Sequence, residues 1–169
     1  MINPALYSSA KTGGSDDWQT PECVLEPVRA LFGGRIDLDP CTTDDNPTRA
    51  RAWFTGDRPG PLTSYAGCGN VFVNPPYSEI HLWIERCKGG INRDQVVALV
   101  PSRTDRPWFH NAHFNAVCFW KGQRLRFVDP LTGQPSKTGA PFPSALLYWG
   151  RKPKEFCFHF GALGKVMFA

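Results

Sequence analysis

The stretch "NVFVNPPYSEIHLWIERC", residues 70–87, decides the fold because it places a strand, a rigid corner and a helix in succession. The β-branched and aromatic residues of its first part, residues 70–74, predict a strand that stops at two prolines. Ser78 is then positioned to cap a helix. That helix has apolar side chains at the spacing of one face, namely Ile80, Trp83, Ile84 and Cys87. A strand followed directly by a helix is the unit from which α/β domains are built.

Segments before this unit extend the same pattern. "TPECVLEPVRALFGG", residues 20–34, predicts a helix with Thr20 as N-cap and Pro21 at its first position, and a proline inside it should kink it. "RIDLD", residues 35–39, predicts a short strand that breaks at the next proline. "PTRARAWF", residues 47–54, predicts a helix of about two turns.

Segments after the unit predict the rest of the sheet. "QVVALV", residues 95–100, is a nearly continuous apolar run, which is typical of a strand buried on both faces in a parallel sheet. Four further apolar segments at short spacing predict an antiparallel end to that sheet: "AVCFW" (116–120), "RLRFV" (124–128), "SALLYW" (144–149) and "EFCFHF" (155–160). The loop from residue 129 to 144 is long, as functional or mobile loops usually are.

These elements predict an α/β fold of Rossmann-like type, with a mixed sheet whose antiparallel strands come from the C-terminal part of the chain. Residues 40–70 are too few for two complete crossovers, which need about 60 residues, so one flank of the sheet should be abbreviated. We expect a flexible N-terminus over residues 1–15 and a single domain over residues 16–169.

Composition indicates an ordinary soluble globular protein, with 41% hydrophobic and 20% charged residues. No run of about 18 apolar residues occurs, so no membrane span is expected. The first residues lack the basic and apolar regions of an export signal, which favours a cytoplasmic location. Six widely spaced cysteines without a CxxC pair fit buried, reduced thiols. No metal is expected, because His110, His113 and Cys118 alone do not make a closed four-ligand site.

Charge is distributed unevenly along the chain. Residues 101–154 contain nine Lys or Arg against two Asp, a net of +7, and the other residues net −3. A basic half of this kind suits a polyanion such as DNA, although a solvated basic surface explains the charge equally well. The candidates for DNA contact are Arg103, Arg106, Lys121, Arg124, Arg126 and Lys137. For Trp108 and Phe109, which lie beside them, core packing is the preferred interpretation.

The corner at residues 74–77 carries the candidate chemistry. Two prolines fix the backbone and offer no N–H, so carbonyl groups of this corner are left free to accept hydrogen bonds. The Asn74 side-chain oxygen and the Pro75 carbonyl could accept the protons of a planar NH2 group, while Tyr77 offers a face for the ring that bears it. This arrangement selects an exocyclic amine on a flat ring. The alternative is a turn that merely ends a strand.

The corner "NPPY" resembles the catalytic motif of S-adenosylmethionine-dependent amino-methyltransferases, which act on adenine N6, cytosine N4 or a glutamine amide. The wider pattern resembles phage-type Dam DNA N6-adenine methyltransferases over roughly residues 16–150. The matching stretches run in order: "DDWQTP" (16–21), "IDLDPC" (36–41), "VFVNPPYS" (71–78), "WIERC" (83–87), "VVALVPSRTDRPWFH" (96–110), "GQRLRFV" (122–128) and "FPSALLYW" (142–149).

The resemblance implies a DNA adenine methyltransferase of a phage or prophage in a bacterial host, with S-adenosylmethionine as cofactor. Asn74, Pro75, Pro76 and Tyr77 would form the catalytic loop. Residues implied at the cofactor are Thr20, Pro21, Asp37, Asp39, Pro40 and Cys41, and Asp57 is a further acidic candidate that could equally be a surface turn residue. The loop after the first strand lacks the usual glycines.

Other functions share these features. The same corner would serve a methyltransferase for RNA or for a protein glutamine, and loss of cofactor binding through the glycine-free loop would leave a catalytically silent DNA-binding domain. The loop containing Lys137 could enter a DNA groove but is too small to be a separate recognition domain. We therefore expect either a short recognition site or one whose reading requires a second subunit, and the chain to be a monomer or weak homodimer.

Overall fold

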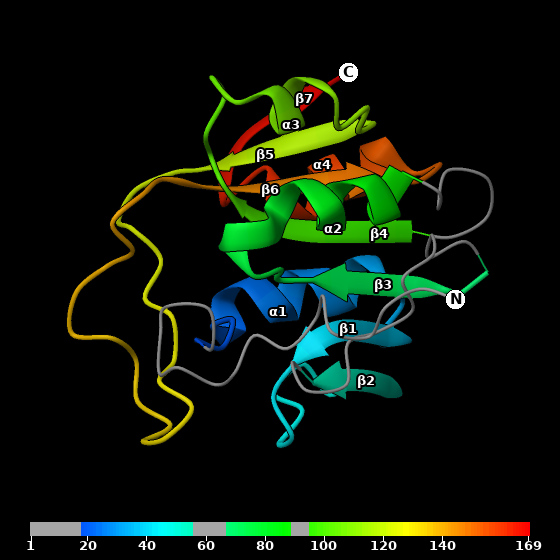
Figure 1. Ribbon diagram of the computed structural model, residues 1–169. Helices are drawn as coiled ribbons and strands as arrows, with labels where there is room; N and C mark the ends of the chain where they lie inside the picture. Colours follow the sequence, from blue (N-terminus) through cyan, green and yellow to red (C-terminus); the bar gives the residue numbers. More distant parts are fainter. Residues whose placement is uncertain (1–17, 56–66, 89–94) are drawn as a thin grey trace, which may run out of the picture.

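The computed structural model describes residues 18–55, 67–88 and 95–169, which form a seven-stranded sheet with helices on both faces (Figure 1). The strands, in their order across the sheet, are β2 (Ala52–Thr55), β1 (Leu38–Thr42), β3 (Asn70–Val73), β4 (Gln95–Pro101), β6 (Ser144–Trp149), β5 (Ala116–Trp120) and β7 (Gly164–Phe168). The helices are α1 (Glu22–Leu31), α2 (Ile80–Cys87), α3 (Pro107–His110) and α4 (Pro153–Phe160), with the 3-10 turn η3 (Tyr77–Glu79) before α2.

Strand directions define two edges of the sheet. β2, β1, β3 and β4 are parallel. β6 is antiparallel to both β4 and β5, and β7 is antiparallel to β5, so β5 runs in the direction of β4. We call the edge where β3, β4 and β5 end the carboxyl edge, and the opposite one the amino edge. This mixed sheet confirms the predicted Rossmann-like fold.

The flank formed by β1 and β2 is abbreviated, as predicted. Residues 43–51 join these two parallel strands through turns and without a helix. A parallel pair usually needs a crossover of about a dozen or more residues, most often a helix. The short connection therefore leaves this side of the sheet thinner than the rest.

Side chains of the central strands alternate between two cores. Phe72 and Val97 pack with α1 and α4 on one face. Val71, Val73 and Val96 pack with α2 and α3 on the other face. This alternation follows from the two-residue period of a strand. Packing on both faces holds β3 and β4 rigidly up to their carboxyl ends.

Helix α1 confirms the predicted helix, and it continues through Pro27 to Leu31. Its start differs from the prediction, because Pro21 holds the N-cap position and no described side chain, including that of Thr20, caps it. Ser78 is likewise not the cap of α2. It lies within η3, and Glu79 precedes the first residue of α2.

The predicted helix over residues 47–54 is wrong, because residues 52–55 form β2. Ala52 pairs with Leu38 of β1, and Trp53 pairs with Asp39. Pairing at the sheet edge overrides the helical preference of the local Arg and Ala residues. The first strand is also displaced: it begins at Leu38 and passes through Pro40. The register with β2 shifts after Asp39, an irregularity that accommodates a proline inside a strand.

The predicted strand over residues 155–160 is also wrong, because this segment lies in α4. Phe156, Phe158 and Phe160 alternate along the sequence and so imitate a strand. In a helix, residues four apart share a face, and accordingly Phe156 and Phe160 are buried while Phe158 is 83% exposed. The predicted strand over residues 124–128 is absent apart from isolated bridges at Val128, and β7 was not predicted.

Phe109 is buried in the core, as preferred from the sequence, and Trp108 packs against the same cluster. Cys87 and Cys118 are buried as expected, whereas Cys23 is exposed. None of the helices in the described ranges is both long and apolar enough to cross a membrane. The flexible N-terminus predicted over residues 1–15 lies outside the described residues, and the single domain over residues 16–169 stays a prediction.

Candidate active site

The loop formed by residues 74–77, which the sequence predicts to be catalytic and which we call the catalytic loop for that predicted role, follows β3 at the carboxyl edge, where α/β sheets of this type bind ligands. Asn74 Nδ2 donates a hydrogen bond to the Trp18 carbonyl at 3.4 Å, and the Tyr77 hydroxyl donates to Asn74 Oδ1 at 3.1 Å. These contacts fix which way the Asn74 amide points. Because an amide oxygen has two lone pairs, Oδ1 retains the capacity to accept a second hydrogen bond.

A cavity of about 220 Å³ lies beside this loop. Asn74, Pro75 and Tyr77 form one wall, and Trp18 and Phe142 add aromatic surface. The rings of Tyr77 and Phe142 meet edge to face, with centroids 5.2 Å apart and an interplanar angle of 78°. Pockets for drug-sized ligands occupy about 300–1,000 Å³. The smaller cavity seen here suits a single flat ring system.

The opposite wall comes from residues that the sequence interpretation did not assign to the site. They are Phe127, Ser136, Thr138, Gly139, Ala140 and Pro141. Gly139 packs so tightly that an added Cβ would lie 2.4 Å from Cβ of Arg124. This close approach explains the glycine and holds the wall against the preceding segment.

Gln19 ties the N-terminal segment to two other parts of the site. Its backbone exchanges two hydrogen bonds of 2.9 Å with Val128. Its side chain donates to Thr43 Oγ1 at 2.9 Å and to both carboxylate oxygens of Asp45 at 2.9 and 3.0 Å. The neighbouring Trp18 is thereby held at the cavity, beside the loop that follows β1.

Below the catalytic loop, Asp39 and Cys41 connect β1 to β3. Cys41 Sγ donates to the Asn74 carbonyl at 3.3 Å, and the Cys41 amide donates to Asp39 Oδ1 at 3.2 Å. Burial raises the pKa of Asp39 to about 6, although hydrogen bonds from Thr48 and other neighbours oppose this. Burial, together with the nearby Asp39, also raises the pKa of the Cys41 thiol, so the thiol remains a hydrogen-bond donor.

The structure brings most of the cofactor candidates to this region. Thr20 and Pro21 are buried at the start of α1, next to the cavity residue Trp18, and Pro40 and Cys41 lie in β1 beside the catalytic loop. Asp39 lies within the same strand, but its carboxylate is enclosed, with the residue only 2% exposed. The candidate Asp57 lies outside the described residues.

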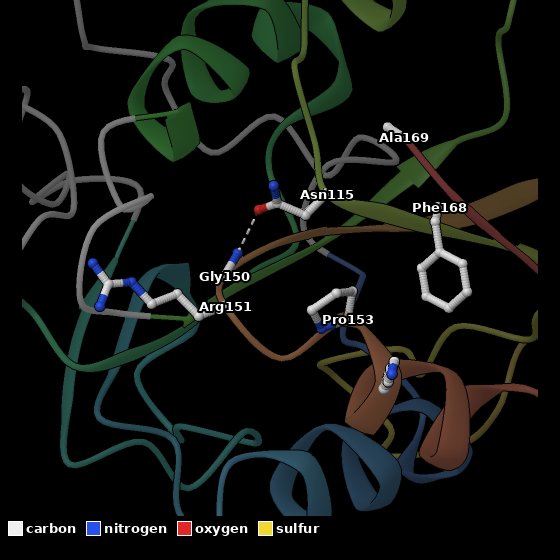
Figure 2. Close-up of a pocket in the computed structure, with 7 residues that line it drawn as sticks. Asn115, Gly150, Arg151, Pro153, Phe168 and Ala169 are labelled. Carbon is white, nitrogen blue, oxygen red and sulfur yellow. Dashed lines mark hydrogen bonds between the residues drawn. The ribbon is translucent and has the colours of Figure 1, made fainter.

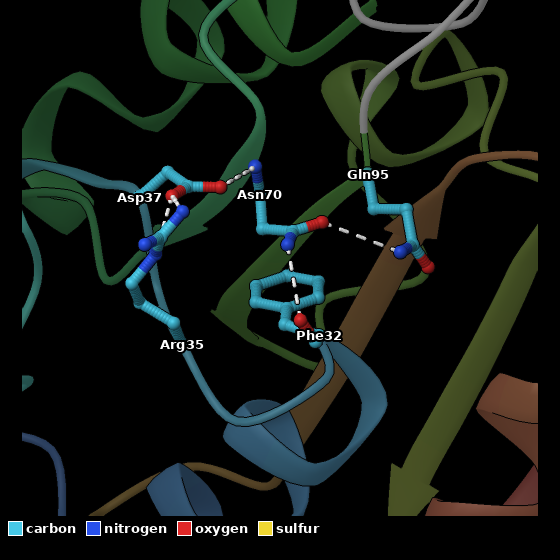
Figure 3. A network of polar contacts seen from close by, with 5 residues as sticks. All are labelled: Phe32, Arg35, Asp37, Asn70 and Gln95. Carbon is cyan, nitrogen blue, oxygen red and sulfur yellow. Dashed lines mark hydrogen bonds and ion pairs between the residues drawn. The ribbon is translucent and has the colours of Figure 1, made fainter.

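Asp37 is the exception, because it precedes β1 at the amino edge (Figure 3). Its carboxylate accepts hydrogen bonds from the Arg35 side chain at 2.9 Å and from the backbone N–H of Asn70 at 3.0 Å. The side-chain amide of Asn70 in turn donates to the Phe32 carbonyl at 3.1 Å and accepts from the Gln95 side chain at 3.3 Å. The structure thus gives Asp37 a place in a network that fastens β1, β3 and β4 together, away from the catalytic loop.

All six candidate DNA contacts lie at the carboxyl edge or on the segment between β5 and β6 that starts there. Arg103 and Arg106 follow β4, Lys121 follows β5, and all three side chains are exposed. The remaining three are Arg124, Arg126 and Lys137, which are also exposed. The basic residues 151, 152 and 154 lie instead at the amino edge, so the cations of this half of the chain are divided between the two edges.

A second cavity, of about 470 Å³, lies at the amino edge (Figure 2). Asn115 and Gly150 form its floor, where the Gly150 amide donates to Asn115 Oδ1 at 2.8 Å. Figure 2 shows the Arg151 side chain extending away from Pro153 and Phe168. This cavity is larger but shares no residue with the catalytic loop, so we place the candidate active site at the smaller one.

The described part of the chain contains no set of side chains that could bind a metal ion. Within residues 18–55, 67–88 and 95–169, no group of three His, Cys, Asp or Glu side chains is arranged to hold an ion. Of the trio considered from the sequence, Cys118 is buried in the sheet, while His110 and His113 are exposed.

A mixed sheet of this order, with an Asn-Pro-Pro-Tyr loop beside a ring-sized cavity at its carboxyl edge, is consistent with a Rossmann-like methyltransferase fold. A scan against protein-family models matches residues 7–158 to the family described as DNA N-6-adenine-methyltransferase (Dam). This match spans most of the 169 residues, and the chain belongs to that family. Membership supports a DNA adenine methyltransferase activity. A search of curated proteins gave no match.

Proposed function

We propose that this chain transfers a methyl group from S-adenosylmethionine to N6 of an adenine that has left the DNA helix and entered the cavity beside Asn74. The observation that carries the proposal is that Asn74, whose side-chain amide is fixed by Trp18 and Tyr77, lines a cavity that also has the aromatic rings of Tyr77 and Phe142. A flat ring with an exocyclic amine matches both features.

The residues around the cavity fit the implied cofactor in chemical kind. That cofactor supplies an electrophilic methyl group on a sulfonium, attached to an amino acid and a nucleoside. Trp18 in the cavity wall offers a stacking surface, and Asp45, which is outside the wall but hydrogen-bonded to the adjacent Gln19, offers a carboxylate for a cationic group. Slight burial opposes ionisation of Asp45, but hydrogen bonds from Thr43 and Gln19 outweigh it and lower its pKa. Thr20, Pro21, Pro40 and Cys41 would complete the binding surface.

The loop at residues 74–77 would act on the adenine by accepting hydrogen bonds from its amine group. Asn74 Oδ1 and the Pro75 carbonyl would each accept one N6–H hydrogen bond, which directs the nitrogen lone pair away from the ring plane and towards the methyl group. As the N6–C bond forms, the S–C bond would break to leave a neutral thioether, and one N6 proton would be released to solvent. The Asn74 carbonyl already accepts the Cys41 thiol, and the Pro76 carbonyl accepts the Glu79 amide at 3.2 Å. These bonds hold the loop rigid, so the acceptors need not reorganise during methyl transfer.

The exposed cations at the carboxyl edge would bind the phosphates that flank the target adenine. Arg103 and Arg106 lie one strand away from the catalytic loop, where β4 ends. Such phosphate contacts would position the duplex without reading its sequence. From the resemblance we also propose that the chain is encoded by a phage or prophage and that it methylates a short, specific site.

The test is a methyl-transfer assay with labelled S-adenosylmethionine and three acceptors offered separately: duplex DNA, RNA and a glutamine-containing peptide. We expect label in duplex DNA. Label in RNA or peptide alone would replace DNA as the substrate, and absence of any heat on titration with S-adenosylmethionine in a calorimeter would leave a silent DNA-binding domain.

A further inference from the structure

Strand β7 lies at one end of the sheet, and its outer side is open (Figure 1, red). It pairs with β5 along its whole length, from Gly164 to Phe168, in an unbroken antiparallel register. Within residues 18–55, 67–88 and 95–169, no strand pairs with the other side of β7. An open edge of this kind is a template for pairing with another chain unless some feature protects it.

The hydrogen bonds that flank the ladder between β5 and β7 show which backbone groups of β7 face outwards. The Lys121 amide donates to the Leu163 carbonyl at 3.1 Å, and the Ala169 amide donates to the Asn115 carbonyl at 3.2 Å. Only every second residue of an antiparallel strand exchanges hydrogen bonds with a given neighbour, so the odd-numbered residues face β5. The residues whose backbone N–H and C=O groups face outwards are therefore Gly164, Val166 and Phe168.

Exposed apolar side chains accompany these backbone groups. Met167 is 52% exposed and Phe168 is 57% exposed. Successive side chains of a strand point to opposite faces of the sheet, so each face of β7 carries one of the two. Met167 is opposite Val117, which belongs to the core under α2 and α3, and Phe168 borders a cavity together with Pro153 of α4. A partner that continued the sheet would cover apolar surface on both faces.

The opposite end of the sheet has a protection that β7 lacks. There, β2 has four residues, and its register with β1 shifts after Asp39. Irregularities of this kind twist an edge strand away from further pairing. The register of β7 is regular, and its one protective residue is Lys165, whose charge disfavours only a partner with a lysine directly opposite.

We propose that β7 pairs with β7 of a second copy of this chain, antiparallel and about a two-fold axis, so that the two sheets join into one. The strand is complementary to itself in this arrangement. With Val166 at the axis, Gly164 of each copy lies opposite Phe168 of the other, and all the outward N–H and C=O groups are paired. In the same register Lys165 lies opposite Met167, so the two lysines do not oppose each other.

The contact is small, so the dimer should be weak. The five residues of β7 span about 17 Å at 3.3 Å per residue. A sheet layer about 10 Å thick and a helix layer of similar thickness give a contact strip of roughly 340 Å² per copy. Stable interfaces bury about 800 Å² per partner. We therefore expect monomers at about 1 μM and a substantial share of dimers at about 500 μM.

The arrangement also determines how the two candidate active sites are directed. The two-fold axis of an antiparallel strand pair is perpendicular to the sheet, so the carboxyl edges of the two copies point in opposite directions. The two copies would not act together on one recognition site. If the proposed function holds, each copy methylates its own DNA, and methyl transfer per chain is the same in monomer and dimer. The dimer itself does not depend on the proposed function.

Sedimentation velocity of the full chain from about 1 μM to about 1 mM tests the pairing, with two variants at the proposed axis. Val166→Pro removes an outward N–H and leaves the hydrogen bonds to β5, because proline is tolerated where the N–H of an edge strand faces solvent. Val166→Ala is the matched control, since it also loses the side chain but keeps the N–H. We expect Val166→Pro to associate at least about tenfold more weakly than Val166→Ala.

A second measurement needs no variant and so holds even if Val166→Pro fails to fold. Amide proton resonances of the unaltered chain are followed by NMR as its concentration is raised. Those of Val166 and Phe168 should shift most, because their N–H groups gain acceptors, and those of Lys165 and Met167, which already face β5, should shift less. An unaltered chain that stays monomeric to about 1 mM would overturn the proposal. So would equal association of the two variants, or shifts confined to another surface.

Discussion

Asn70 and Asn74 stand at opposite ends of the same strand, β3, and the molecule uses them differently. At the amino edge, the Asn70 amide group donates to the Phe32 carbonyl and accepts from Gln95, at 3.1 and 3.3 Å. At the carboxyl edge, the Asn74 side chain is held by Trp18 and Tyr77, and Asn74 also lines a cavity. One amide fastens strands together, and the other retains accepting capacity for a ligand.

Residue type alone therefore does not identify a ligand-binding site. Satisfied polar groups lower the free energy of the fold, whereas a polar group held rigid beside a cavity is available to a substrate. The amino edge continues this fastening, since the Tyr148 hydroxyl donates to Gln95 Oε1 at 2.9 Å and accepts the Lys152 amide at 3.0 Å. Stability should therefore depend on the amino edge, and methyl transfer on the carboxyl edge.

The largest effect is expected from Asn74→Ala. Removing an acceptor that strengthens in the transition state should lower kcat by about 100-fold to 1,000-fold. Binding of S-adenosylmethionine, measured by calorimetry, should stay close to that of the unaltered chain. Activity that survives within about tenfold would remove Asn74 from its assigned role.

A smaller effect, on how the free energy of unfolding depends on pH, is expected from Asp39→Asn. The pKa of Asp39 in the folded protein, about 6, lies above its ordinary value of 3.8. Its contribution to the free energy of unfolding is thus fully present below pH 3.8 and is lost as pH rises through 6, by up to about 3 kcal/mol. Urea denaturation between pH 4 and 7 should show this decline in the unaltered chain and not in Asp39→Asn. Parallel curves would contradict the assigned burial.

Asn70→Ala sharpens the contrast with Asn74. It leaves polar groups of Phe32 and Gln95 without their partner and should lower the free energy of unfolding by about 1–3 kcal/mol. At a temperature where the variant is folded, kcat should stay within about twofold. The opposite result, a stable but inactive variant, would exchange the roles of the two edges.

Cys41 tests how the catalytic loop is held. Cys41→Ala removes the donor to the Asn74 carbonyl and should lower kcat by up to about tenfold, in keeping with one weak hydrogen bond, with little change in the KM for DNA. Cys41→Ser keeps a donor and should restore most of the loss. If serine is as poor as alanine, packing rather than the hydrogen bond positions the loop.

The smallest effect concerns the cations of the two edges. Neutralising Arg103 and Arg106 should reduce the steepness of log K against log salt by up to about 2, because each phosphate contact contributes about 0.9. The matched control neutralises Arg151 and Lys154, which are exposed at the amino edge. Equal changes for the two pairs would mean that DNA does not prefer the carboxyl edge.

Local sequence patterns were enough to predict those strands and helices in which the spacing of apolar residues matches the side chains that are buried. The runs at β3 and β4 and the apolar face of α2 are of this kind. They failed where pairing or burial elsewhere decides the outcome: the edge strand β2 forms because β1 is beside it, and α4 was mistaken for a strand because its phenylalanines alternate.

The same distinction applies to the candidate site. The loop at residues 74–77 could be proposed as the candidate catalytic loop from four consecutive residues, since their chemistry is local. Trp18, Phe127 and Phe142 could not be assigned, because they reach the cavity only through the pairing of Gln19 with Val128 and the return of the chain over residues 129–142. The resemblance implied a place for Asp37 at the cofactor, but Asp37 precedes β1 at the amino edge, away from the candidate site.

The most direct test of the central claim identifies the nucleoside that receives the methyl group. Duplex DNA is incubated with the unaltered chain and isotope-labelled S-adenosylmethionine, digested to nucleosides and analysed by mass spectrometry, with Asn74→Ala and Asn70→Ala in parallel. We predict label in N6-methyladenine for the unaltered chain and for Asn70→Ala, and a loss of at least about 100-fold for Asn74→Ala. Label in a methylated cytosine, or equal label with Asn74→Ala, would contradict the claim.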